Sequence, residues 1–336
     1  MKKMILAAVA VAAVAIGGVL PRPALAETPS ISLGFAKCAH CTAMALTPDF
    51  AKGVEIKATP FTTGTDVLTA LVTKNIDVAQ VTYLHYVIAL DKGFDVIAIS
   101  GQVSGGSALI VGKDLAVQPN DWASLKKAIA DHKAAGKPFR VAASRGNAQD
   151  IHMRGAFAKQ GIDINKDVTF VNIPNPSDHL QALRRGEVEL ICTVEPFATQ
   201  VLQADAGKMF GTPYDQAAGN LTNVILTRPD VIASKRKELE ATVRAIVATD
   251  DHIAKDRAAF SAVVTKITGL DKKIADDAVK NLDPDPKLYR TRTLAIATMM
   301  RDLKYVGSDV TAEAEKRMDY SLLEAATGKP KSELGF

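Results

Sequence analysis

The chain has 336 residues, of which 47% are hydrophobic and 23% are charged. This balance excludes a mostly disordered chain, and the length suits two domains or two lobes better than one minimal fold. Taken alone, the formal net charge of +4 would suggest an anionic partner such as a nucleic acid.

Residues 1–26 have the features of a secretory signal peptide. Lys2 and Lys3 precede an apolar stretch over 5–20, and Ala24-Leu25-Ala26 forms a small-x-small cleavage site. The apolar stretch of about 16 residues is shorter than the roughly 20 residues that span a membrane. We therefore expect a cleaved signal, a mature chain that starts at Glu27, and a protein exported to the periplasm.

This segment accounts for most of the basic excess. It carries three basic residues and no acidic ones, which leaves 41 − 3 = 38 basic residues against 37 acidic ones, a net charge of +1. The longest later basic run is Lys235-Arg236-Lys237, which is too short for the basic face that nucleic-acid binding needs. No later segment is apolar enough to span a membrane. We expect a soluble monomer that contacts neither nucleic acid nor the membrane interior.

The first part of the mature chain alternates short apolar runs with segments of helical spacing. The expected strands cover 31–35, 54–60, 78–81 and 95–100, and the expected helices start near residue 41 and cover 65–74 and 83–90. This order favours an α/β fold with a largely parallel sheet.

The same order restarts near residue 139. The expected strands cover 139–143, 168–173 and 188–193, and the expected helices cover 147–160 and 177–186 and start again near Pro196. A shift of 112 residues aligns the two halves and brings Leu68, Ala70, Leu71, Ile76 and Asp77 onto Leu180, Ala182, Leu183, Val188 and Glu189. A repeat of this kind predicts two similar lobes whose strand ends and helix starts face a shared crevice. It also makes Tyr83 correspond to Glu195.

Two apolar strands, at 108–111 and 224–227, are expected to connect the lobes as a hinge. The resulting division has a first lobe over 27–112, a second lobe over 113–222, and a mainly helical return to the first lobe over 223–336.

Several segments resemble one family of proteins. They are residues 64–99, 186–191 with Val194-Glu195-Pro196, and 224–232. These segments resemble the periplasmic substrate-binding proteins of ABC importers in the nitrate, sulfonate and taurine class, and the resemblance covers most of residues 30–255. It implies the type II periplasmic binding fold, a closing cleft, a membrane permease as partner, and neither catalysis nor a cofactor. The family usually has Trp-Glu-Pro where this chain has Val194-Glu195-Pro196.

Two polar turns are the best candidates for contacts with an anionic ligand. Thr62-Thr63-Gly64-Thr65 and Ser144-Arg145-Gly146-Asn147 each join a strand to a helix, where unpaired backbone N–H groups and the helix dipole favour an anion. The expected ligand-binding residues are Thr62, Gly64, Thr65, Ser144, Gly146 and Asn147. Ordinary capping of the helices is the alternative role for the hydroxyl residues.

Further candidates lie near other strand ends. Glu195 follows a predicted strand and would suit an ammonium group on the ligand, which is the role that the family resemblance implies for it. A structural carboxylate that accepts hydrogen bonds from nearby amides is the alternative. Lys37, Tyr83 and Gln102 complete the set of residues expected to contact the ligand.

Cys38-Ala39-His40-Cys41 is the unusual feature of the sequence. It follows the first strand, so Cys38, His40 and Cys41 are expected at the same cleft. Three roles remain open: a disulfide formed in an oxidising compartment, thiol–disulfide exchange at a helix N-terminus, and contact with a soft metal ion or another thiophilic ligand. A c-type haem site is excluded, because Thr42 stands where that motif requires His. Cys192, inside a predicted strand, is expected to be a buried and inert thiol.

The sequence thus predicts a periplasmic solute-binding protein of an ABC importer that captures a small organic anion, such as a sulfonate, by hinge closure. The first alternative is a binder of a soft metal ion or metal complex that uses Cys38, His40 and Cys41. The second alternative is an enzyme, either a periplasmic thiol–disulfide oxidoreductase or a relative of the pyrimidine-precursor synthase for thiamine. That synthase family has a cysteine-rich iron motif, which this chain matches only at Cys38 and Cys41.

Overall fold

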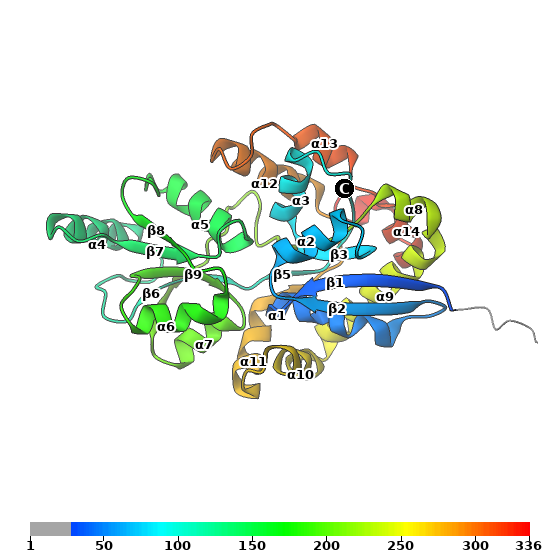
Figure 1. Ribbon diagram of the computed structural model, residues 1–336. Coiled ribbons are helices and arrows are strands. Elements are labelled where there is room, and N and C mark those ends of the chain that lie inside the picture. Colours follow the sequence, from blue (N-terminus) through cyan, green and yellow to red (C-terminus); the bar gives the residue numbers. More distant parts are fainter. Residues whose placement is uncertain (1–27) are drawn as a thin grey trace, which may run out of the picture.

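The computed structural model describes residues 28–336 and has two lobes side by side (Figure 1). The predicted signal peptide over 1–26 and the predicted start at Glu27 lie outside the described residues. Among residues 28–336 no helix is both long enough and apolar enough to cross a membrane.

Each lobe is built on a five-stranded sheet. In the first sheet the strand order is β2 (Glu55–Phe61), β1 (Ser30–Ala36), β3 (Val78–Thr82), β11 (Asn223–Thr227) and β4 (Ile97–Gly101). In the second sheet it is β10 (Gly207–Gly211), β6 (Ser107–Gly112), β9 (Leu190–Val194), β7 (Arg140–Ala143) and β8 (Thr169–Asn172). The pairings leave one reversed strand in each sheet, β11 in the first and β6 in the second. The expected α/β architecture with two mostly parallel sheets is confirmed.

The repeat predicted from the sequence is visible in the strands. Shifted by 112 residues, β3 falls on β9 residue for residue, and α2 (Gly64–Val72) falls on the turn and helix that cover 176–184. The reversed strand occupies the same place in both sheets. It lies between β3 and β4 in the first sheet and between β9 and β10 in the second. The two lobes therefore share one topology.

The crossings between the lobes differ in detail from the expectation. The strands expected to connect the lobes, 108–111 and 224–227, each pair within one sheet, as parts of β6 and β11. The chain crosses just before each of them, first through β5 (Val103–Gly105), which pairs with β12 (Leu282–Pro284). The boundary predicted at residue 112 therefore moves to a point before Ser107. Gly105 and Gly106 turn the chain here with φ of 90° and 83°, which favours glycine at both positions.

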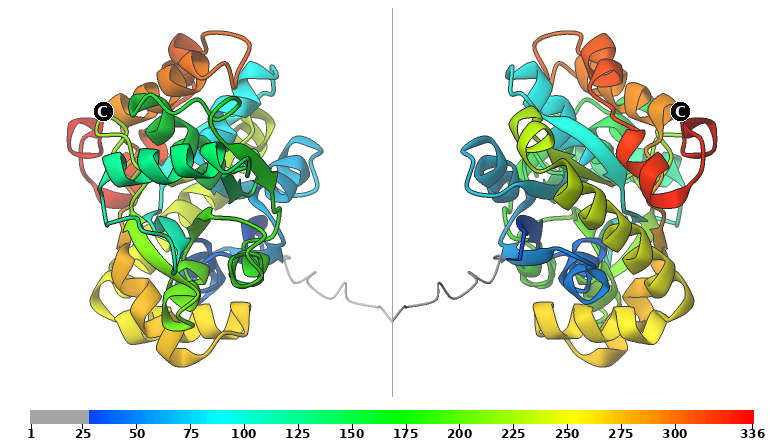
Figure 2. Two further views of the ribbon diagram at one scale, coloured as in Figure 1. Left: turned by 90° about the vertical axis from the view of Figure 1, so that its left-hand side faces the viewer. Right: turned by 90° about the vertical axis from the view of Figure 1, so that its right-hand side faces the viewer.

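The remaining helices cover the sheets. The first lobe carries α1 (Ala39–Thr42), α2 and α3 (Tyr83–Asp91), and the second carries α4 (Trp122–Ala134), α5 (Ala148–Lys159), α6 (His179–Arg184) and α7 (Phe197–Gln203). The last third forms α8 (Pro229–Ser234), α9 (Arg236–Lys255), α10 (Arg257–Thr268), α11 (Lys272–Ala278), α12 (Arg290–Asp302), α13 (Thr311–Lys316) and α14 (Ser321–Thr327). Figure 1 shows these last helices, yellow-green to red, mainly around the first lobe, which faces the viewer in the right-hand view of Figure 2.

Local sequence explains where the key elements begin and face. Thr63 and Asp66 form a capping box at the start of α2, and Thr82 and His85 form one at the start of α3. In the second sheet, alternate residues of β6 pack on opposite faces, which gives that sheet an apolar core on each side. This layering fixes the sheet ends that meet between the lobes.

Candidate functional site

A cavity of about 310 Å³ lies between the two lobes, at the carboxyl ends of their central strands. First-lobe segments that line it follow β1, β2 and β3, and second-lobe segments follow β7, β8 and β9. This is where an open α/β sheet is expected to bind ligands. No aspartate or glutamate lines the cavity, and Lys37 is its one lysine or arginine among the described residues.

Eight of the predicted ligand-binding residues line this cavity. They are Lys37, Cys38, His40, Cys41, Thr62, Gly64, Ser144 and Asn147. Both lobes contribute residues to its wall.

Gly64 and His85 show why this wall is closely packed. A Cβ atom on Gly64 would lie 2.7 Å from Cε1 of the His85 ring, so a larger residue would displace that ring. Burial lowers the pKa of His85 to about 4, and the Asn147 amide from the other lobe partly opposes this shift. Burial likewise lowers the pKa of His40 to about 4. Both rings are therefore neutral at neutral pH and offer hydrogen bonds rather than charge.

Five predicted site residues do not line the cavity, and the first two of them are Tyr83 and Gln102. Tyr83 is fully buried, near Tyr289 and Tyr320 in the first-lobe core, where burial raises the pKa of its phenol. Gln102 lies on the chain that leaves the first lobe, and its Nε2 donates to Oδ1 of Asp250 at 3.2 Å. Both side chains pack within the first lobe and its crossing and do not reach the cavity.

Thr65 and Gly146 belong to the predicted turns but do not line the cavity. The Thr65 hydroxyl lies 3.4 Å from Nε2 of His85, beneath the cavity wall. The backbone N–H of Gly146 donates to Oδ2 of Asp150 at 3.0 Å, and that of Arg145 donates to the side chain of Asn172. Two amides of the second turn are thus already paired within their own lobe.

Glu195 also lies outside this cavity. It borders a second cavity of about 450 Å³ beside the crossing, together with Asn281 and Tyr214. Its carboxylate accepts from the backbone and hydroxyl of Thr199, both at 3.0 Å, and from Nδ2 of Asn281 at 2.7 Å. Burial raises the pKa of Glu195, while these hydrogen bonds oppose the shift. This is the geometry of a structural carboxylate, the alternative that the sequence left open.

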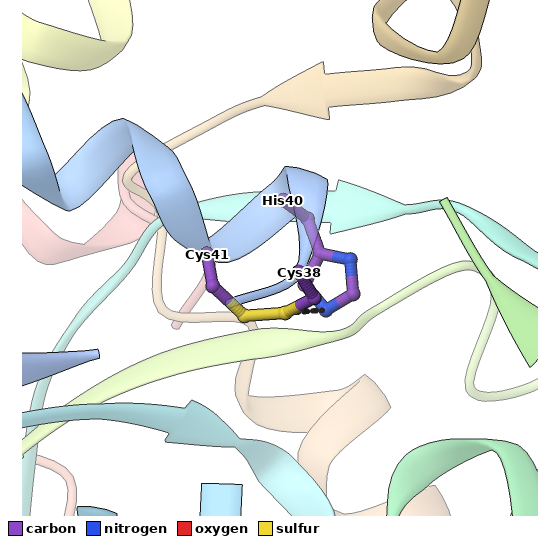
Figure 3. A group of neighbouring side chains, drawn as sticks. All are labelled: Cys38, His40 and Cys41. Carbon is purple, nitrogen blue, oxygen red and sulfur yellow. Dashed lines mark hydrogen bonds between the residues drawn. A yellow bond between two sulfur atoms is a disulfide. The ribbon is translucent and has the colours of Figure 1, made fainter. Parts of the chain in front are cut away.

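Cys38 and Cys41 are joined by a disulfide in the cavity wall. Nε2 of His40 lies 3.2 Å from Sγ of Cys38 (Figure 3). Cys192 is a buried free thiol in β9, as expected, and it does not line the cavity.

Two functional candidates were missed by the sequence analysis. Gln80 of β3 and Asn223 of β11 are fully buried and line the cavity. Three of their amide atoms lack a hydrogen-bond partner in the part of the chain that the structure describes. They are Nε2 and Oε1 of Gln80 and Oδ1 of Asn223. Since an unpaired buried amide costs about 1–3 kcal/mol, these groups are candidates for contact with a ligand. A polar residue inside an otherwise apolar strand was the signal that could have identified Gln80.

Family comparison supports the resemblance seen in the sequence. The model of the NMT1-like family matches residues 24–268, which is more than half of the chain. The protein belongs to the NMT1-like family. A 76-residue segment is also 30% identical to the bicarbonate-binding protein CmpA of Synechococcus, and this match spans 22% of the present chain and 17% of CmpA.

Solved structures confirm the fold. The periplasmic nitrate-binding protein NrtA from Synechocystis matches with a TM-score of 0.77 and 17% identity, covering 92% of this chain and 91% of NrtA. The alkanesulfonate-binding protein SsuA from Xanthomonas axonopodis, bound to MOPS, matches with a TM-score of 0.69 and 15% identity, covering 86% and 98%. A zinc-bound ligand-binding component of an ABC-type import system from Staphylococcus aureus matches at 0.74 and 13%, covering 90% and 100%. The chain has the fold of the two-lobed binding proteins of ABC importers, not a thioredoxin fold.

Proposed function

We propose that this protein is the periplasmic solute-binding component of an ABC importer and that it captures a small organic anion in the cavity between its lobes. The observation that carries this proposal is the composition of the cavity wall. Among the residues that the structure describes, it combines one lysine and no carboxylate with the starts of α2, α3 and α5 and with several side-chain amides and hydroxyls. Such a wall can hold an anion through hydrogen bonds and helix dipoles without burying a competing negative charge.

The start of α5 is the best anchor for the anion. Asn147 makes no side-chain cap there, and the backbone N–H groups of Ala148 and Gln149 have no acceptor among the described residues. Both residues line the cavity, opposite Gln80 and Asn223 from the first lobe. An oxyanion that bridges these two N–H groups and Nε2 of Gln80 would satisfy donors from both lobes at once. The unpartnered atom of Asn223 is Oδ1, an acceptor, so it would need a donor on the ligand.

Capture would then follow from closure. Contacts made by both lobes exist only when the lobes are close, so a ligand that makes them favours the closed form. A membrane permease that recognises the closed form would receive loaded protein in preference to empty protein. Sulfonates, nitrate and bicarbonate are the first anions to test. The similar proteins described above are named as binding proteins for alkanesulfonates, nitrate and bicarbonate.

Mass spectrometry of material that co-purifies with the mature protein, followed by calorimetric titration of the stripped protein, tests the proposal. Titrants should include taurine, ethanesulfonate, nitrate and bicarbonate, with putrescine as a cationic control. We expect saturable binding of at least one anion and no binding of putrescine. Binding of the cation alone, or a neutral co-purified ligand with no anion response, would contradict the proposal.

Taurine and ethanesulfonate also separate two roles for Glu195, because they differ in an amino group. If Glu195 held that group, Glu195→Ala would weaken taurine binding by about 1.5–3 kcal/mol and leave ethanesulfonate unaffected. Since the carboxylate is already engaged by Thr199 and Asn281, we expect equal affinities in wild type and variant and a lower melting temperature in the variant.

A further inference from the structure

The Cys38-Ala39-His40-Cys41 segment places three soft donor groups in one wall of the cavity. One ligand atom from each of Cys38, His40 and Cys41 lies within 4.8 Å of the others (Figure 3). All three residues line the cavity, and Cys38 is partly exposed in it. Two thiolate sulfurs and an imidazole this close together could supply three of the four ligands of a tetrahedral zinc site.

The backbone of this segment is held by contacts that do not depend on the disulfide. The N–H of Ala39 donates to the backbone oxygen of Glu195 at 2.9 Å, which ties the segment to the second lobe. Nδ2 of Asn223 donates to the backbone oxygen of His40 at 3.0 Å, which ties it to β11. Opening the disulfide would therefore leave the three donors near their present places.

His40 is suited to the role of a metal ligand. Its ring is 2% exposed and lines the cavity, and the neutral imidazole is a common metal ligand. Nδ1 of the ring has no hydrogen-bond partner among the described residues. The ring is thus free to take the tautomer that presents the Nε2 lone pair beside Sγ of Cys38.

The disulfide decides whether this cluster can bind a cation. Disulfide sulfurs carry no thiolate, whereas reduced cysteines supply the soft anionic ligands that zinc and monovalent copper prefer. We propose that reduction of the Cys38–Cys41 disulfide opens a soft-cation site formed by Cys38, His40 and Cys41, with its fourth position facing the cavity. A dithiol reductant supplies two electrons and two protons, the Sγ–Sγ bond breaks, and the reductant leaves as its own disulfide. Metal binding then releases the thiol protons.

The class of cation follows from the surroundings. No carboxylate from residues 28–336 lines the cavity, so calcium and magnesium would lack their usual oxygen ligands. Cys192 is fully buried in β9 and lies outside the cavity lining, so it is not a fourth ligand. A soft ion held by sulfur and nitrogen is the remaining class, and this site does not depend on the anion that the cavity binds.

Zinc titration of untagged protein in both redox states tests the proposal, with a chromophoric chelator as competitor. The oxidised wild type is the matched control, since it has the same sequence. We expect one zinc per reduced chain and none per oxidised chain. Cobalt should give a thiolate-to-metal charge-transfer band only in the reduced protein, and zinc should protect two thiols from alkylation, counted by intact mass. Equal zinc binding in both states, or no binding by the reduced protein, would overturn the proposal.

Variants assign the ligands. His40→Gln should weaken zinc binding by at least about tenfold, because loss of even an outer partner of a metal ligand costs about 10–100-fold. Cys38→Ser should abolish stoichiometric binding, whereas reduced Cys192→Ser should bind zinc as wild type does. Dependence on Cys192 would place the metal elsewhere and refute the assignment. Anion titration of the oxidised protein is a separate readout, so its outcome and the zinc outcome can fail independently.

Discussion

The two lobes share a topology, but α2 and α3 of the first lobe and α5 of the second start differently at the cavity. In the first lobe, Thr63 and Asp66 cap α2, and Thr82 and His85 cap α3, so side chains of the lobe itself occupy amides at both helix starts. In the second lobe, α5 starts at Asn147 without a side-chain cap. The first lobe contributes a preformed wall with buried amides and a disulfide, while α5 of the second lobe contributes free backbone donors. Elsewhere in the second lobe, the Asn175 side chain caps the turn before α6. The same fold thus offers two kinds of binding surface, according to which residue stands at the cap.

Tyr83 and Glu195, which correspond in the repeat, also differ between the lobes. Both follow the central strand of their sheet, and both are buried outside the cavity between the lobes. Tyr83 packs in the first-lobe core, and Glu195 holds Thr199 and Asn281 near the crossing. Corresponding positions have diverged in chemistry and kept a structural role.

The largest expected effect concerns acid, to which both lobes should be equally sensitive. His40 and His85 in the first lobe and His152 and His179 in the second are buried, and burial lowers the pKa of each to about 4. The folded state therefore favours neutral rings, and stability is lost as the pH falls from about 6.5 to about 4. Each ring should contribute on the order of 3 kcal/mol by pH 4.

Denaturant unfolding between pH 7 and pH 4 measures this loss. His85→Gln and His179→Gln should each reduce the dependence on pH by a similar amount, one in each lobe. His132→Gln is the control, because His132 is only partly buried. A change confined to one lobe's variant would show that this lobe unfolds first in acid.

The next effect concerns a contact that joins the lobes next to the binding turn. Asp150 of α5 is fully buried, pairs with Arg154 at 2.6 Å, and accepts from Gly146 and from the Tyr305 hydroxyl at 3.0 Å. Asp150→Ala would leave Arg154 partly buried without its partner, so we expect a loss of about 3–5 kcal/mol in the free energy of unfolding. The exposed pair of Asp131 and Lys127 provides the control, and Asp131→Ala should change stability by no more than about 0.5 kcal/mol.

Gln80→Leu is expected to have an intermediate effect, with opposite signs on the stability of the empty protein and on ligand affinity. Gln80→Leu removes an unpartnered buried amide, so the empty protein should melt no lower than wild type. Ligand affinity should fall by about 1–3 kcal/mol if the amide binds the anion. Calorimetry and thermal melting measure the two quantities, with Gln181→Leu on an exposed face as the control. Unchanged affinity would assign Gln80 to the core.

Gln80 also marks the limit of what the sequence could predict. The repeat, the strand order of each half and the two cleft-facing turns follow from periodicity, which survives in one sequence. Gln80 stands out as a polar residue in an apolar strand, but nothing local says whether that strand face meets a helix or a cavity. Glu195 has the opposite difficulty, because its place after a strand suggests the cleft, whereas Thr199 and Asn281 draw it toward the crossing. Those contacts depend on residues up to 86 positions away, which a local pattern does not contain.

The smallest effect directly separates the two kinds of helix start. Thr63→Ala removes a capping box, so the free energy of unfolding should fall by about 1 kcal/mol while anion affinity is retained. Asn147→Ala removes no cap, so stability should change little, and affinity should fall by about 1 kcal/mol through the lost side-chain contact in the cavity. Unfolding and calorimetric titration of both variants give four numbers. A similar stability loss in both would mean that Asn147 caps α5 after all, and the contrast between the lobes would then rest on their side chains alone.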